Sequence, residues 1–238
     1  MLIESPGFEP RCYALVPAAG VGARSGAAMP KQYVKVAGRA MMAHTLDALL
    51  QVPRLTATLV VLAPDDTQFE SAVPGFQGER AWVARCGGES RAESVAQGLM
   101  ELRARGAQPH DWVLVHDAAR CLVRPEWVTG LIEACELDEV GGLLAMPVAD
   151  TMKEEGEGGR IAHTLDRRHK WLAQTPQMFR LGLLQPALAG ADGSVTDEAS
   201  AVEALGHQPL LVAAPLENFK LTWPADFELA ERLLRSRA

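Results

Sequence analysis

The chain has 238 residues, 48% apolar and 22% charged, so it can bury a sizeable core, and we expect one globular domain rather than a disordered segment. Its formal net charge of −7 argues against an extended nucleic-acid-binding face, which needs clustered lysines and arginines. The four cysteines are widely separated and form no CxxC pair, which disfavours a zinc site or a disulfide framework and favours the cytoplasm. Because no apolar run approaches the ~18 residues of a membrane span, we expect no membrane association.

The first 146 residues alternate between short apolar runs and segments with a helical hydrophobic period. Ser90 and Glu93 have the spacing of a capping box at one helix start, and Pro125 suits the first turn of another helix. Apolar strands separated by amphipathic helices are typical of a parallel sheet covered on both faces, so we expect a doubly wound α/β sandwich. The expected strands are residues 13–16, 57–63, 81–85, 112–115 and 142–146, and the expected helices are residues 40–51, 90–105 and 125–138.

The alternation stops near residue 147. Residues 150–171 carry a glycine- and glutamate-rich turn, near 155–159, between two short stretches of Thr, Ile, His and Leu, which predicts a two-stranded excursion. An isolated hairpin is marginally stable in water, so we expect it to pack on something, such as a second copy of the chain. Beyond it we expect helices at residues 180–189 and 196–205, strands at 209–213 and 218–222, and a closing helix from residue 224.

Ligands of open parallel sheets bind beyond the carboxyl ends of the strands, and the first strand is followed by a loop rich in glycine and alanine. Gly20 and Gly22 allow the backbone to approach a phosphate, and Arg24 and Lys31 add positive charge. The dinucleotide fingerprint GxGxxG fails because Ser25 stands at the third glycine position, and no GxxxxGK[ST] motif is present. The loop predicts a phosphate site; a glycine-rich turn with solvated cations is the alternative.

Three further loops carry polar side chains at expected strand ends. In residues 86–95 a Gly-Gly pair opens onto a helix start, where Ser94 is either a ligand group or a helix-surface residue. Asp117 directly follows a buried strand and is the natural carboxylate for Mg²⁺ beside a phosphate, whereas His116 is more typical of a packed residue. Lys220 lies in an expected short strand, and the chain has only five lysines, although Lys220 and Lys31 could both be solvated.

Seven segments in order, over nearly the whole chain, resemble the 2-C-methyl-D-erythritol 4-phosphate cytidylyltransferases of the non-mevalonate isoprenoid pathway. They are PAAGVGAR, PKQY, GGESRAESV, VHDAAR, DTMK…DR…TPQ, TDEASAVE and ENFKLT. The resemblance implies a Rossmann-like three-layer sandwich with a mostly parallel sheet, of the nucleotide-diphospho-sugar transferase type, as a single domain over residues 1–238. It also implies a protruding β-arm, residues 148–172, that joins two subunits in a homodimer, and Mg²⁺-dependent use of CTP.

The implied reaction is attack of the methylerythritol phosphate oxygen on the α-phosphorus of CTP with release of pyrophosphate, and alignment and cations supply most of the catalysis of such a step. By the same resemblance, Arg24 and Lys31 stabilise the transition state. The implied nucleotide-binding residues are Pro17, Ala18, Ala19, Gly20, Gly22, Gly88, Glu89, Ser94 and Ala118. The implied substrate-binding residues are Asp117, which is also the metal ligand, Arg120, Lys220, and Thr151 and Arg167 on the neighbouring subunit's arm.

Other functions remain open on the sequence. A related enzyme that transfers CMP to ribitol 5-phosphate shares most of these motifs. An NAD-dependent dehydrogenase is disfavoured by the broken glycine fingerprint, and a non-catalytic nucleotide sensor gives no reason for a cation at Arg167. The chain departs from the usual family pattern at Ser25, where a bulky apolar residue is common, and at Cys121, which is often proline; neither change removes a charge.

Overall fold

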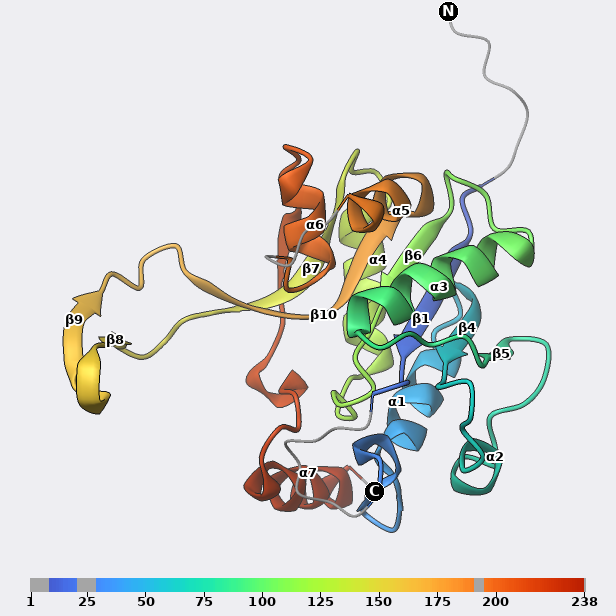
Figure 1. Cartoon of the computed structure of the whole chain (residues 1–238), viewed down its shortest axis with the longest axis horizontal. Helices are drawn as coiled ribbons and strands as arrows, with labels where there is room; N and C mark the ends of the chain where they lie inside the picture. Colours follow the sequence, from blue (N-terminus) through green and yellow to red (C-terminus); the bar gives the residue numbers. More distant parts are fainter. Residues whose placement is uncertain (1–8, 21–28, 191–194, 238) are drawn as a thin grey trace, which may run out of the picture.

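The computed structural model describes residues 9–20, 29–190 and 195–237, and these contain a seven-stranded sheet in the order β11-β7-β10-β6-β1-β4-β5 (Figure 1). Neighbouring strands are parallel except at β10, which is antiparallel to both β6 and β7. The expected mostly parallel sheet is confirmed. Its strands are β1 (Cys12–Pro17), β4 (Leu55–Val61), β5 (Ala81–Ala84), β6 (Trp112–Val115), β7 (Gly141–Pro147), β10 (Trp171–Arg180) and β11 (Leu210–Ala213).

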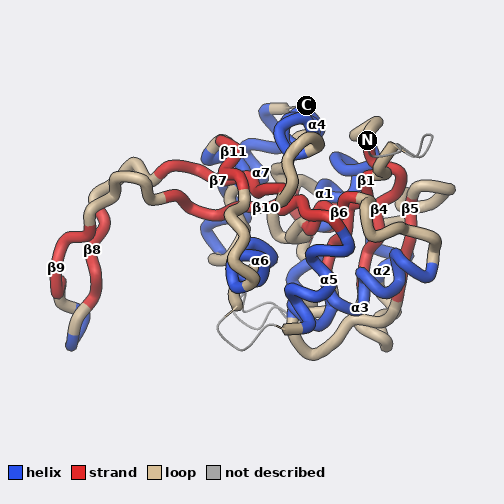
Figure 2. The backbone as a smooth tube through the Cα atoms, turned by 90° about the horizontal axis from the view of Figure 1, so that it is seen from above, coloured by secondary structure: helices blue, strands red, loops and turns tan. Residues whose placement is uncertain are grey.

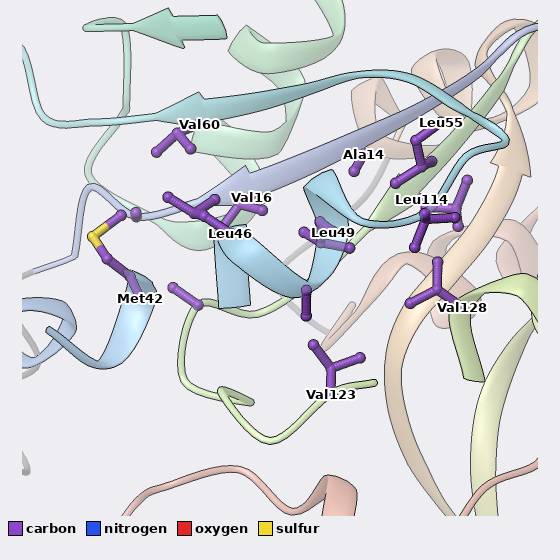
Figure 3. Packing of buried hydrophobic residues seen from close by; sticks show 14 of the residues in the cluster. Ala14, Val16, Met42, Leu46, Leu49, Leu55, Val60, Leu114, Val123 and Val128 are labelled. Carbon is purple, nitrogen blue, oxygen red and sulfur yellow. The ribbon is translucent and has the colours of Figure 1, made fainter. Parts of the chain in front are cut away.

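Helices cover both faces of the sheet because successive residues of a strand point to opposite sides. In β1, Ala14 and Val16 pack into one apolar cluster, and Tyr13 and Leu15 pack into the other. Figure 3 shows the first cluster, where side chains of α1 meet those of β1. Helices α1 (Met41–Leu50) and α4 (Pro125–Cys135) cover this face, and α3 (Arg91–Ala104), α5 (Leu181–Ala189) and α6 (Glu198–Ala204) cover the opposite one. The three-layer sandwich is confirmed.

Two predicted helix starts are confirmed. The Ser90 hydroxyl accepts a hydrogen bond from the Glu93 N–H at 3.1 Å, and the Glu93 carboxylate accepts one from the Ser90 N–H at 3.3 Å, which completes the capping box of α3. Pro125 opens α4, where its missing N–H costs no helical hydrogen bond. A closing helix, α7 (Pro224–Ser236), also forms as expected.

The two-stranded excursion is confirmed. Strands β8 (Met152–Glu155) and β9 (Ile161–Leu165) pair antiparallel around the turn η3 (Glu157–Gly159). Figures 1 and 2 both show this arm standing away from the body of the molecule, connected to it by the extended ends of β7 and β10. The arm therefore has little of its own chain to pack against.

Residues 218–222 do not form the expected strand. The short helix η4 (Leu216–Asn218) leads into an irregular segment instead. The buried Asn218 amide donates to Gln174 Oε1 at 2.8 Å and to the Thr175 carbonyl at 2.9 Å, while the Leu221 N–H donates to the Ala119 carbonyl. The Asn218 side chain and one backbone hydrogen bond thus hold this segment where a strand ladder was expected.

Besides η4, strand β10 and four small elements of the described chain were not predicted. The small elements are η2 (Lys31–Tyr33), β2 (Lys35–Val36), β3 (Arg39–Ala40) and α2 (Phe69–Ala72). Within the described ranges, no helix combines the length and the apolar character needed to cross a bilayer.

Candidate active site

The four predicted loops meet at one cavity of about 530 Å³ at the carboxyl ends of the parallel strands. This position follows from the topology, because parallel strands present these ends at one edge of the sheet. The predicted site residues on its wall are Pro17, Ala18, Ala19, Gly20, Lys31, Gly88, Glu89, Ser94, Asp117, Ala118 and Lys220.

Two loops touch at the base of the cavity. The Ala18 N–H donates to the Val61 carbonyl and the Gly87 N–H donates to the Leu62 carbonyl, both at 2.8 Å. A Cβ atom at Gly87 would lie 2.2 Å from the Ala19 Cβ and 2.8 Å from the Leu62 oxygen, so only glycine fits there. The loop after β1 and the loop after β5 are therefore packed directly on each other.

Ser94 shapes the second loop from the first turn of α3. Its side chain is buried, and its hydroxyl accepts the Gly88 N–H at 3.2 Å and donates to the Ser90 carbonyl at 2.9 Å. Gln32 does the same for the first loop, because its side-chain amide donates to the Ala18 carbonyl at 2.8 Å. Both backbones that line this side of the cavity are thus held by side chains that also face it.

Asp117 stands at the centre of a charged cluster. Its Oδ1 accepts from Arg91 Nε at 2.8 Å, its Oδ2 pairs with Lys220 Nζ at 2.9 Å, and Arg120 Nε lies 3.9 Å from Oδ2. Burial by itself would raise the pKa of the Asp117 carboxyl, but Arg91 and Lys220 outweigh burial and hold that pKa well below its usual range. The carboxylate therefore stays ionised and keeps the Lys220 ammonium at the cavity.

Arg91 connects this cluster to α6. Its Nη1 and Nη2 donate to the two carboxylate oxygens of Glu198, at 2.7 and 3.0 Å. The Glu198 side chain is almost completely buried, at 1% exposure. Burial lowers the pKa of the Arg91 guanidinium, but Glu198 and Asp117 reverse that effect and raise the pKa above its ordinary value. Arg91 is therefore held as a cation between two buried carboxylates.

His116 is a structural residue of the third loop. Its Nδ1 lies 3.1 Å from the Thr175 hydroxyl and its Nε2 lies 3.3 Å from the Arg120 carbonyl. The same hydroxyl accepts the Asp117 N–H at 3.0 Å, so its own hydrogen is left to donate to Nδ1. Complete burial lowers the pKa of the imidazole to about 4. A neutral His116 thus fixes the turn that presents Asp117, in agreement with its interpretation as a packed residue.

A glycine-rich loop, a capped helix start and a cluster of cations around one carboxylate now share a single cavity. A family model described as 2-C-methyl-D-erythritol 4-phosphate cytidylyltransferase matches residues 12–236. The chain belongs to this family. The family's members are cytidylyltransferases, which agrees with the resemblance drawn from the motifs.

Curated relatives and solved structures agree with this assignment. The chain is 55% identical over 237 residues to the bifunctional enzyme IspD/IspF of Albidiferax ferrireducens, covering all of this chain and 56% of that enzyme. It is 54% identical over 225 residues to the 2-C-methyl-D-erythritol 4-phosphate cytidylyltransferase of Laribacter hongkongensis, covering 94% of this chain and 96% of that protein. A crystal structure of 4-diphosphocytidyl-2C-methyl-D-erythritol synthase is 41% identical with a TM-score of 0.85, covering 96% of this chain and all of its own. The Francisella tularensis cytidylyltransferase follows, 32% identical with a TM-score of 0.79, covering 93% and 99%.

Among the predicted site residues of this family member that the structure describes, three are not on the cavity wall. Arg24 and Gly22 lie outside the described residues. Arg120 lies behind Asp117, where its guanidinium donates to the carbonyls of Asn218, at 2.7 Å, and Ala173, at 3.3 Å. The other two, Thr151 and Arg167, are on the arm, which stands away from the body of its own chain (Figures 1 and 2). There Arg167 donates to the Ala149 carbonyl.

Sequence reasoning assigned no role to three residues whose side chains hold the described site together: Gln32 and Arg91 on the cavity wall, and Glu198 behind it. All three lie inside motifs that carried the resemblance, PKQY, GGESRAESV and TDEASAVE. A glutamate in the first turn of a helix suits the helix dipole and is an ordinary surface residue by pattern alone. Glu198 differs from an ordinary surface glutamate only by its burial against Arg91, and this burial can be recognised only once the fold is known.

Proposed function

We propose that this chain transfers CMP from CTP to 2-C-methyl-D-erythritol 4-phosphate, giving 4-diphosphocytidyl-2-C-methyl-D-erythritol and pyrophosphate, in the synthesis of isoprenoid precursors in the cytoplasm. The observation that carries the proposal is the meeting of all four motif loops at one cavity, in a chain that matches the family model over residues 12–236. The proposal divides the cavity into a nucleotide end and an acceptor end.

The nucleotide end is formed by the loops after β1 and β5. Ala18, Ala19 and Gly20 have small side chains or none, so a triphosphate can approach the backbone there. Gly88 and Ser94 stand at the start of α3, where a fixed set of backbone and hydroxyl groups can select cytosine by its donors and acceptors. Purines are excluded if the space between the two loops fits one pyrimidine ring.

The cations supply the transition-state stabilisation. When the acceptor phosphate oxygen attacks the α-phosphorus, negative charge builds up around one atom, and fixed cations stabilise it without reorganisation. We assign this role to Lys31, which lines the cavity and whose Nζ donates to the Leu221 carbonyl, and to Arg24. Lys220, which Asp117 holds at 2.9 Å, binds the acceptor phosphate, with Arg120 behind it.

The site is compatible with the Mg²⁺ ion that the family resemblance implies. No group of three or more metal-ligating side chains exists among the residues that the structure describes, but Mg²⁺ commonly needs only one or two carboxylates together with substrate phosphates. Asp117 offers such a carboxylate on the cavity wall, and because each of its oxygens accepts a hydrogen bond from one cation, each still has a second lone pair. Asp117 and the phosphate oxygens of CTP would therefore hold the ion. A bound Mg²⁺ would neutralise charge on the phosphates.

The homodimer completes the site in this proposal. Thr151 and Arg167 are exposed on an arm that stands away from its own body, so they are placed to reach a second subunit (Figure 1). A partner's arm would bring Arg167 to the acceptor end, where it would add a cation for the polyol phosphate.

The test is a direct assay of the purified chain with CTP, Mg²⁺ and methylerythritol phosphate, in which pyrophosphate release is measured and the product is identified by mass spectrometry. Ribitol 5-phosphate is the competing acceptor in a parallel reaction. A clear preference for ribitol 5-phosphate would overturn the acceptor assignment, and CTP binding without any turnover would identify a nucleotide sensor instead.

A further inference from the structure

Helix α6 does not line the cavity, yet its first residue is among the most deeply buried charges of the described chain. Glu198 is almost completely buried, and both of its carboxylate oxygens accept from Arg91. Arg91 is the first residue of α3 and does line the cavity. An ion pair between the buried Glu198 carboxylate and the Arg91 guanidinium, whose side chain is 30% exposed, thus ties the start of one helix to the start of another, directly behind Asp117.

The Arg91 guanidinium binds Glu198 with one edge and Asp117 with another. Nη1 and Nη2 face Glu198, so the remaining donor edge, Nε, faces Asp117 Oδ1 at 2.8 Å. Because the guanidinium is planar, the bidentate grip of Glu198 sets the direction of the bond to Asp117. Oδ1 is occupied in this way, and Oδ2 is left to hold Lys220.

Glu198 is itself held rigidly by β10. The Ala199 N–H donates to Gln177 Oε1, and the Gln177 amide donates to Asp197 Oδ2, both at 2.8 Å. The residues on either side of Glu198 are therefore fastened to the central sheet. The carboxylate that orients Arg91 has a defined position relative to β6, which ends just before Asp117.

If the pair served only to join two helices, its burial would cost free energy that an apolar contact would not. The desolvation of a buried carboxylate such as Glu198 often offsets its attraction to a cation, and apolar residues of similar volume often stabilise such a contact as well or better. A requirement to hold Asp117 explains the pair, since an apolar contact between α3 and α6 would leave Oδ1 without its partner.

We propose that Arg91 and Glu198 are positioning residues of the transfer reaction: Glu198 orients the Arg91 guanidinium, which holds Asp117 so that Lys220 is presented to the acceptor phosphate. The inference rests on the proposed function and names two further residues that act at the same site. It predicts a loss in the use of methylerythritol phosphate, on the order of 10–100-fold in kcat/KM, the range typical of lost supporting hydrogen bonds around an active-site ligand. The KM for CTP stays close to that of the unchanged chain.

The experiment separates positioning from stability with the single variant Arg91→Gln and the double variant Arg91→Gln/Glu198→Gln. Arg91→Gln leaves Glu198 buried without its cation, so both the melting temperature and the kcat/KM for methylerythritol phosphate fall. In the double variant Arg91→Gln/Glu198→Gln the uncompensated charge is gone, so the melting temperature recovers, while kcat/KM for the acceptor stays low because Asp117 still lacks a cation at Oδ1. A merely structural pair predicts that activity returns together with stability.

The matched control is an arginine–glutamate pair at the opposite end of the sheet. Arg54 Nη2 and Glu136 Oε2 are also 2.8 Å apart, but the Arg54 side chain is 52% exposed. The double variant Arg54→Gln/Glu136→Gln should keep the acceptor kinetics of the unchanged chain.

The outcomes distinguish the inference from the proposed function. If the unchanged chain makes no product, the proposed function is wrong and the inference falls with it. If the unchanged chain is active and the Arg91→Gln/Glu198→Gln variant keeps its kcat/KM for methylerythritol phosphate, or loses only CTP binding, the inference alone is overturned. Should the glutamine variants fail to fold, Glu198→Asp keeps the charge on a side chain one methylene shorter. It should then lower acceptor kcat/KM, and unchanged kinetics would overturn the inference.

Discussion

Replacing Gly87 with alanine should displace the loop that lines the nucleotide end of the cavity, and the size of the displacement follows from the contacts of the new Cβ atom. The new Cβ would lie 2.2 Å from the Ala19 Cβ, which is 1.2 Å short of the 3.4 Å where ordinary van der Waals contact begins. The Leu62 carbonyl oxygen, 2.8 Å away, blocks movement into the sheet. The loop after β1 must therefore move outward by about 1 Å, and a displacement of that size costs on the order of 100-fold in rate. This loss corresponds to about 2.7 kcal/mol of transition-state stabilisation.

The assay for Gly87→Ala is the kcat/KM for CTP at saturating methylerythritol phosphate, together with the melting temperature. Overpacking should also cost about 1–3 kcal/mol of stability, so the melting temperature should fall by roughly 2–4 °C for each kcal/mol. Gly130→Ala is the control, because a Cβ atom at Gly130, in α4, meets nothing within 4 Å and alanine favours a helix. A Gly87→Ala enzyme with the unchanged kcat/KM for CTP would refute the idea that contact between these two loops sets the geometry of the nucleotide.

Three further predictions concern charge. Arg24→Ala and Lys31→Ala should each lower kcat by on the order of 100-fold or more and change CTP affinity far less, because each cation acts mainly in the transition state; equal losses in CTP binding, measured by calorimetry, would contradict this. Mixed dimers of an Arg167→Ala chain and an Arg24→Ala chain should regain part of the lost activity, since one of the two sites then has both cations; verified heterodimers without any recovery would exclude a shared site. The free energy of unfolding should fall as the pH drops from about 6.5 toward 4. The pKa of His116 is about 4 in the folded chain and about 6.5 in the unfolded chain. Within that pH range the unfolded chain therefore binds more protons, and acid favours it. His116 should account for about 3 kcal/mol of this fall. Denaturant titrations of His116→Gln should show a free energy of unfolding that depends correspondingly less on pH.

The strands of the sheet could be predicted from the sequence where both of their faces are buried, because such strands consist of apolar residues. The apolar runs of β1, β4 and β6 are continuous because both faces are covered, and Ser90 with Glu93 marks the start of α3 through local hydrogen bonds. Strand β10 was not predictable because it carries Gln174, Thr175 and Gln177 in its buried part. Their hydrogen-bond partners, His116, Asn218 and the start of α6, come from distant parts of the chain. Without these partners in view, the polar residues did not indicate a buried central strand.

The site was predictable as far as topology places it. Loops that follow parallel strands meet at one edge, and the four loops around Ala18, Gly88, Asp117 and Lys220 do share one cavity. The strand expected at 218–222 was wrong because Phe219 and Leu221 alternate with polar residues as in a strand, while Asn218 fixes an irregular path. The pair of Arg91 and Glu198 was beyond sequence reasoning, since its members are 107 residues apart and only burial reveals their charges as partners.

The wall of the cavity that carries Lys220 is synthesised after the last strand of the central sheet. Lys31 and Leu221, which are joined by a hydrogen bond, are separated by 190 residues, and such distant contacts form only after long stretches of chain have been brought together. A nascent chain that has emerged only as far as residue 215 already contains every strand of the central sheet but not Lys220. Catalytic competence should therefore appear only after the scaffold of the central sheet has formed.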